Sequence, residues 1–184
     1  MSGAAAGPAP IGALALFLLV LALQRAGELL LSAWNTRRLL ARGAREYGAE
    51  HFPRIVAVHV LLPILLVAEV LALGARPGRL WPLWLGLWLA AQALRYAAVR
   101  ALGERWSVRI VVPPGEPVVR RGPYRFLRHP NYLAVVIELF AAPMMFGAWR
   151  TAIVISLLDA AVLWIRIRAE EAALGDGGRF RDLA

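Results

Sequence analysis

The chain has 184 residues, of which 60% are hydrophobic, and its mean hydropathy is positive. An ordinary soluble domain is about 45–50% apolar, so the composition indicates a single membrane domain that covers residues 1–184. The lack of cysteine excludes disulfides, a thiolate nucleophile and cysteine metal clusters. No two of the three histidines have metal-ligand spacing, so no metal is expected.

The net charge is +9, and all 21 basic residues are arginine. In a membrane protein, such an excess is typical of cytoplasmic loops that face anionic lipid. No basic helix with interleaved aromatic residues occurs, so nucleic acid is not an expected partner.

The apolar runs predict an all-α integral membrane protein with five transmembrane helices, because each run is long enough to cross ~30 Å of hydrocarbon. Arg25 and Glu28 in the first run are three residues apart, so they either pair with each other or turn inward. Glu69 is expected to reach the membrane interface, and Arg95 to extend to a cytoplasmic boundary. The predicted spans are residues 11–33, 53–73, 80–101, 131–149 and 151–174.

The segment 103–130 differs from the rest because it is rich in proline, glycine and charge. It contains one short β-like run at residues 108–112. A tight turn at residues 148–150 follows the fourth span, so the last two spans are expected to form an antiparallel hairpin.

The arginines are distributed unevenly between the connecting segments. Residues 34–54 hold five and residues 103–128 hold six, whereas the opposite side holds three, Arg76, Arg79 and Arg150. The positive-inside rule therefore predicts a multi-pass protein of the inner or plasma membrane, with the segment 103–130 in the cytoplasm.

The run RRGPYRFLRHPNY at residues 120–132 is the strongest candidate for a binding site. Pro130 suits the first position of a helix. We therefore expect His129 to be the N-cap and the helix to continue from Asn131. The free N–H groups of that helix end and Arg128 would then face the same space. This pattern predicts a pocket for an anionic group.

Charged residues on the last span form the second half of the candidate site. Asp159, Arg166 and Glu170 are separated by seven and four residues and share one helical face. Glu138 lies on the face of Asn131, about 10 Å deeper in the fourth span. An ordinary salt-bridged helix end accounts equally well for the charges at residues 166–171. If they do form a site, a carboxylate at Arg128 and an ammonium at Glu170 or Glu171 would suit an amino-acid moiety.

Two motifs, GPYRFLRHPNY at residues 122–132 and RIRAEEAAL at residues 166–174, resemble the isoprenylcysteine carboxyl methyltransferase family of integral membrane enzymes. The resemblance implies S-adenosylmethionine as cofactor and a lipophilic acceptor that enters from the membrane. It implies that Arg166 lies near the acidic group of the acceptor. One departure is Glu116, where the family often has histidine. The implied cofactor-binding residues are Val118, Val119, Gly122, Tyr124, Arg128, His129, Pro130, Tyr132 and either Glu170 or Glu171.

The runs at residues 25–53 and WSVRI at residues 106–110 resemble a bacterial branch that O-methylates alkylpyrones or alkylresorcinols beside type III polyketide synthases. An ionised carboxylate or hydroxypyrone needs only alignment and desolvation in a closed pocket. A phenol, with a pKa near ~10, needs a base. The candidate bases are His129, Glu170 and Glu138. Arg166, Glu170 and His129 are the catalytic candidates, and Arg166, Glu138 and Asn131 the acceptor-binding candidates.

Three other functions stay open at this point. The first is N-methylation of a phospholipid or other amine, although an arginine in the acceptor site argues against a cationic acceptor. The second is an NADPH-dependent membrane reductase with a related C-terminal hairpin. The third is a non-enzymatic membrane scaffold or small transporter. The oligomeric state does not follow from the sequence.

Overall fold

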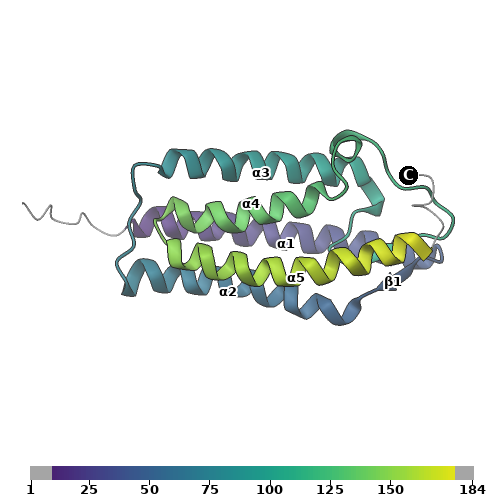
Figure 1. Cartoon of the computed structure of the whole chain (residues 1–184), viewed down its shortest axis with the longest axis horizontal. Coiled ribbons are helices and arrows are strands. Elements are labelled where there is room, and N and C mark those ends of the chain that lie inside the picture. Colours follow the sequence, from purple (N-terminus) through teal and green to yellow (C-terminus); the bar gives the residue numbers. More distant parts are fainter. Residues whose placement is uncertain (1–9, 177–184) are drawn as a thin grey trace, which may run out of the picture.

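The computed structural model describes residues 10–176 as a bundle of long helices that run side by side (Figure 1). The prediction of a helical protein is confirmed. Three short 3₁₀ helices, η1 (Ala49–His51), η2 (Gly103–Arg105) and η3 (Gly122–Arg125), lie at one end of this bundle. The α-helices of the described part are α1 (Ile11–Ala41), α2 (Phe52–Ala72), α3 (Trp81–Leu102), α4 (Pro130–Met145) and α5 (Trp149–Asp176).

The same end of the bundle carries a small antiparallel sheet. Its strands are β1 (Arg45–Tyr47) and β2 (Ile110–Val112), with Glu46 opposite Val111. The sequence indicates β2 through its β-branched run but gives no signal for β1. The sheet ties the connection after α1 to the long segment between α3 and α4.

Helices α4 and α5 form the predicted antiparallel hairpin. Helix α4 continues through Pro143 and ends at Met145, and Gly147 in the turn has a φ of 70°. A Cβ at Gly147 would lie 1.9 Å from the backbone oxygen of Arg76, so only glycine fits this turn. The close approach also fixes the connection between α2 and α3 against the hairpin.

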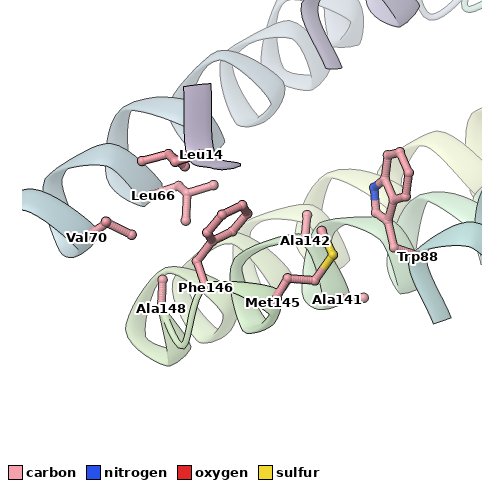
Figure 2. Packing of buried hydrophobic residues seen from close by; sticks show 9 residues of the cluster. All are labelled: Leu14, Leu66, Val70, Trp88, Ala141, Ala142, Met145, Phe146 and Ala148. Atoms are coloured by element: carbon pink, nitrogen blue, oxygen red, sulfur yellow. The ribbon is translucent and has the colours of Figure 1, made fainter. Parts of the chain in front are cut away.

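The apolar core lies between helix faces rather than around the whole of each helix. One cluster, shown in Figure 2, joins α1, α2, α3, the end of α4 and the α4–α5 turn, and Phe146 points toward Leu66 in it. A second cluster around Leu62, Leu139 and Ile155 continues along the bundle. Many leucines on the outer faces, such as Leu30 and Leu157, are exposed, as expected for helices whose outer surface meets lipid.

In the described part, two helical segments, Ile11–Ala41 and Ala49–Ala72, are long and apolar enough to cross a bilayer. Helix α4 is apolar but shorter. Helix α3 has Gln92 and Arg95 in its interior, and α5 has a charged final third. The five-span topology therefore stays a prediction.

Ion pairs between charged side chains join α1, α3 and α4 in the middle of the bundle. Arg25 pairs with Glu28 at 2.7 Å and also binds Glu138. Arg95 binds Glu138 from α3 and lies 3.5 Å from Glu28. The expectation that Arg95 extends to a membrane boundary is therefore wrong, because it is 3% exposed and its charge is neutralised inside the protein.

Glu69 also has a different place from the one expected. It is 3% exposed, and its carboxylate accepts hydrogen bonds from the backbone N–H and the hydroxyl of Thr151, both at 2.7 Å. It therefore caps the first turn of α5 from α2 instead of reaching the interface. A carboxylate is favoured there because the N–H groups of a first helical turn have no partner within the helix.

Replacement of Glu138 by alanine would leave Arg25 and Arg95 without their shared carboxylate. Removal of one partner from a buried ion pair costs about 3–5 kcal/mol. We therefore expect Glu138→Ala to lower the unfolding midpoint of the detergent-solubilised protein strongly, as followed by circular dichroism.

Glu104→Ala is the matched control, since Glu104 is largely exposed and pairs with Arg38 and Arg42 at the surface. Its loss should cost less than about 1 kcal/mol. Equal midpoints for the two variants would contradict the assignment of Glu138 as the centre of a buried ion-pair network.

Candidate functional site

A cavity of about 610 Å³ opens at the end of the bundle that carries the sheet. Its walls come from the segment between α3 and α4, from the first turn of α4 and from the last third of α5. Ligand sites commonly have volumes of about 300–1,000 Å³, so the cavity can hold a small molecule. The hairpin brings residues from the two sequence motifs to this one space.

The start of α4 contributes the first group of polar side chains. Pro130 is the first residue of the helix and His129 is its N-cap, as predicted. The carbonyl of His129 accepts hydrogen bonds from the N–H groups of Tyr132 and Leu133, both at 3.1 Å. The His129 ring stacks on Tyr132 with a centroid distance of 5.3 Å. Both side chains line the cavity.

The end of α5 contributes Arg166 and Glu170, which meet at Tyr132. The hydroxyl of Tyr132 accepts a hydrogen bond from Arg166 Nε at 2.9 Å and donates one to Glu170. Arg166 is 6% exposed, and its Nη2 also donates to the backbone oxygen of Val108. Tyr132 therefore fixes the guanidinium and the carboxylate relative to each other.

His129 connects this group to the next acid along α5. Its Nε2 lies 3.2 Å from Glu171, and its Nδ1 lies 4.0 Å from Glu170. The sequence left open which of the two acids faces a ligand. Glu170 lines the cavity and Glu171 does not, so Glu170 is the candidate for ligand binding and Glu171 orients the imidazole.

The remaining predicted residues divide into two groups. Val118, Val119, Tyr124, Arg128 and Asn131 line the cavity. Three do not line it: Gly122, Pro130 and Glu138. Gly122 has a φ of 56° and packs η3 against α3, where a Cβ would lie 3.1 Å from that of Ala101.

The expectation that Glu138 contacts an acceptor is therefore not supported by its position. It binds Arg25 and Arg95 in the bundle interior, and both of its carboxylate oxygens are used there. The depth of Glu138 follows from the helix rise, but its two cationic partners come from other helices, which the pattern of α4 alone does not reveal.

The cavity lining contains more arginine than acid, although one of its arginines, Arg109, pairs with Glu46 outside the lining at 2.7 Å. The lining includes six arginines and one acid, Glu170. Arg128 makes no ion pair or hydrogen bond with any residue in the range 10–176, whereas Arg105 pairs with Glu116 at 2.6 Å. Glu116, the departure from the family pattern, thus neutralises an arginine at the rim.

Tyr124 adds a neutral hydroxyl to the same wall. Burial, with a smaller effect of the negative charge of Glu170, raises the pKa of the Tyr124 phenol above its usual value. The phenol therefore stays protonated at physiological pH and can donate a hydrogen bond to a ligand.

Several lining residues are not among the site residues that the sequence predicts. Trp106, Ser107 and Ile110 form one wall, within the element WSVRI. Helix α1 supports this wall through Ser32, Asn35 and Thr36. Their spacing places these three polar residues on one helical face, and this pattern at the end of an apolar helix could have revealed a buried polar contact.

Comparison with known proteins gives a family for the chain. Residues 84–176 match the isoprenylcysteine carboxyl methyltransferase (ICMT) family. Among curated proteins, the uncharacterized protein YpbQ of Bacillus subtilis is 36% identical over 159 residues, which cover 86% of this chain and 95% of that protein. An uncharacterized protein of Haemophilus influenzae is 27% identical over 148 residues, covering 80% of this chain and 86% of that protein. No solved structure matches the chain significantly.

The chain belongs to the isoprenylcysteine carboxyl methyltransferase family. Members of this family are integral membrane methyltransferases that use S-adenosylmethionine as methyl donor. Membership of this family indicates that the chain is a membrane methyltransferase. The matched region includes every predicted site residue.

The cavity fits this cofactor of the ICMT family. Trp106 Nε1 and Asn131 Oδ1 are buried, belong to lining residues and have no hydrogen-bond partner within residues 10–176. They offer a donor and an acceptor to a bound molecule, because buried polar groups without partners are costly. Arg128 and Glu170 offer opposite charges for a carboxylate and an ammonium. The described residues include no group of three or more side chains suited to a metal ion.

Proposed function

We propose that the protein is an S-adenosylmethionine-dependent O-methyltransferase that acts on a lipophilic acidic acceptor at the membrane. The acceptor class is an alkylpyrone- or alkylresorcinol-type polyketide, or an isoprenoid carboxylate. The observation that carries this proposal is the excess of arginine over acid in the cavity lining, where Glu170 is the one acid among the described lining residues.

The charge balance of the cavity favours an anionic acceptor. S-adenosylmethionine carries a carboxylate, an ammonium and a sulfonium, so it adds net positive charge to a site that is already cationic. An acceptor with an ionised oxygen offsets this charge, whereas an amine acceptor increases it. The same reasoning disfavours N-methylation.

Each lining residue then has a role that follows from its chemistry. Arg128 and the N-terminus of α4 bind the cofactor carboxylate, and Glu170 binds its ammonium. Val118, Val119 and Tyr124 form the wall of the segment between α3 and α4. The bound cofactor supplies an electrophilic methyl group. Arg166 holds the anionic oxygen of the acceptor in line with it, and Tyr132 keeps Arg166 in that orientation.

A base is required only for some acceptors. A carboxylate or an acidic enol is ionised at pH 7 and needs alignment and exclusion of water. A phenol with a pKa near ~10 needs to lose a proton. His129 is our candidate for that step, because it lines the cavity and Glu171 orients its ring. Glu138 is not a candidate, since it does not line the cavity and two arginines bind its carboxylate.

The proposed topology places the cavity in the cytoplasm. The arginine-rich segments at residues 34–54 and 103–128 lie at the cavity end of the bundle, and the connections with Arg76, Arg79 and Arg150 lie at the other end (Figure 1). This separation supports five spans with the cavity on the side of soluble S-adenosylmethionine.

The direct test is incubation of the purified protein with methyl-labelled S-adenosylmethionine and a lipid extract, followed by mass spectrometry. We expect a labelled methyl ether or methyl ester of a lipophilic acid. Labelled phosphatidylethanolamine derivatives would instead establish an N-methyltransferase. Thermal stabilisation by NADPH, with none by S-adenosylhomocysteine, would establish a reductase, and no response to either would favour a scaffold.

Glu170→Gln should weaken S-adenosylhomocysteine binding about 10- to 100-fold, because a hydrogen bond to a charged group contributes roughly 1.5–3 kcal/mol. Isothermal titration calorimetry measures this affinity. Glu104→Gln is the control, since it removes an exposed acid that pairs with Arg38 and Arg42, and none of these three residues lines the cavity. Equal affinities for the two variants would remove Glu170 from the cofactor site.

Arg166→Lys should reduce methyl transfer at least about 10-fold while the affinity for S-adenosylhomocysteine changes less than twofold. Lysine keeps the positive charge but cannot bind Tyr132 and an acceptor oxygen with the fixed geometry of a guanidinium. Single-turnover rates and calorimetry separate the two effects. A large loss of cofactor affinity would reassign Arg166 to the cofactor.

A further inference from the structure

Helix α1 lies outside the segment that matches the ICMT family, yet three of its polar residues reach the wall of the cavity. Ser32, Asn35 and Thr36 are 2%, 1% and 8% exposed. They lie at positions i, i+3 and i+4, so they form one face of the helix. We name these three residues the α1 clasp.

The clasp binds the backbone and side chains of the segment that follows α3. Asn35 Nδ2 donates to the carbonyl of Trp106 at 2.8 Å and to that of Gly103 at 3.3 Å. The hydroxyls of Thr36 and Ser32 lie 2.9 Å and 3.2 Å from that of Ser107. Gly103 is the C-cap of α3 and Trp106 lies in the segment after it, so Asn35 fixes the start of this segment against α1.

Val108 is the point where α1 and α5 meet through the wall. Its N–H donates to the Ser32 hydroxyl at 3.0 Å, and its carbonyl accepts from Arg166 Nη2. The residue is thus held from both sides, by a clasp residue and by the candidate acceptor-binding arginine. A shift of Val108 would move its carbonyl oxygen, which accepts one of the hydrogen bonds that orient Arg166.

The position of the segment 103–108 depends on the clasp more than the packing of the helices does. Neither apolar core cluster contains any residue of the segment 103–108. The buried residues that join the helices around Leu66 and Leu139 therefore remain in place when a clasp hydroxyl is removed. The local effect should exceed the effect on global stability.

We propose that Ser32, Asn35 and Thr36 are positioning residues for methyl transfer, which act through Val108 on Arg166. This inference rests on the proposed function, because Arg166 is assigned there to the acceptor. It gives the N-terminal helix a part in the reaction without any contact between that helix and the ligand.

Ser32→Ala in the full-length protein is the primary test. We expect methyl transfer to the lipid extract to fall about 3- to 10-fold, which corresponds to the loss of the hydrogen bond that positions Val108. S-adenosylhomocysteine affinity should change less than twofold, and the Val108 amide should exchange its hydrogen faster in the unliganded protein. Ser32→Thr, which keeps the hydroxyl, should restore most of the rate.

A double-mutant cycle separates positioning from general destabilisation. In the Arg166→Lys background, Ser32→Ala should cause little further loss, because both changes disturb the same contact at Val108. Thr151→Ala is the matched control, since it removes a buried hydroxyl that bonds Glu69 at the opposite end of α5. It should lower the melting temperature without a matching loss of rate. Thr36→Val, with an unchanged side-chain volume, repeats the test if Ser32→Ala does not fold.

Two negative results have different meanings. A wild-type protein that neither binds S-adenosylhomocysteine nor methylates the extract overturns the proposed function and this inference together. A wild-type protein that does both, with Ser32→Ala equally active or with losses that multiply independently in the cycle, overturns the role of the clasp alone.

Discussion

The antiparallel contact between α4 and α5 is the constraint on which the rest of the structure depends. The turn at residues 146–148 is closed by a glycine that lies against the backbone of Arg76, so the hairpin has no room to shift there. Because the two helices start from this fixed turn, the first turn of α4 meets the last third of α5. Tyr132 then lies between Arg166 and Glu170, and the cavity forms around them.

The polar groups in the interior of the bundle have partners within the protein, whereas some of those at the cavity do not. In the interior, Glu138 is neutralised by Arg25 and Arg95, and these ion pairs join α1, α3 and α4. At the cavity, Arg128 has no ionic partner within residues 10–176 and Trp106 Nε1 has no hydrogen-bond partner there. Loss of one partner of such a buried ion pair destabilises the fold, whereas polar groups left without partners are available for a ligand.

The matched family region supplies the hairpin, and the N-terminal helix supplies support for its wall. Ser32 on α1 and Arg166 on α5 both form a hydrogen bond with the backbone of Val108. The sheet between β1 and β2 adds a second connection between the N-terminal part and the same segment. The cavity is therefore a property of the whole described chain, although its charged residues come from the C-terminal half.

The sequence by itself determined the helical class, the hairpin, the start of α4 at Pro130 and the two motifs that meet at the cavity. These features depend on local chemistry: apolar length, the fixed φ of proline and the spacing of charges on one helix. Only the tertiary structure decided that Arg95 and Glu138 neutralise each other, that Glu69 caps α5, and that Glu170 rather than Glu171 lines the cavity. Each of these outcomes depends on a side chain from another helix, and the pattern of a single helix shows which face is polar but not which partner covers it.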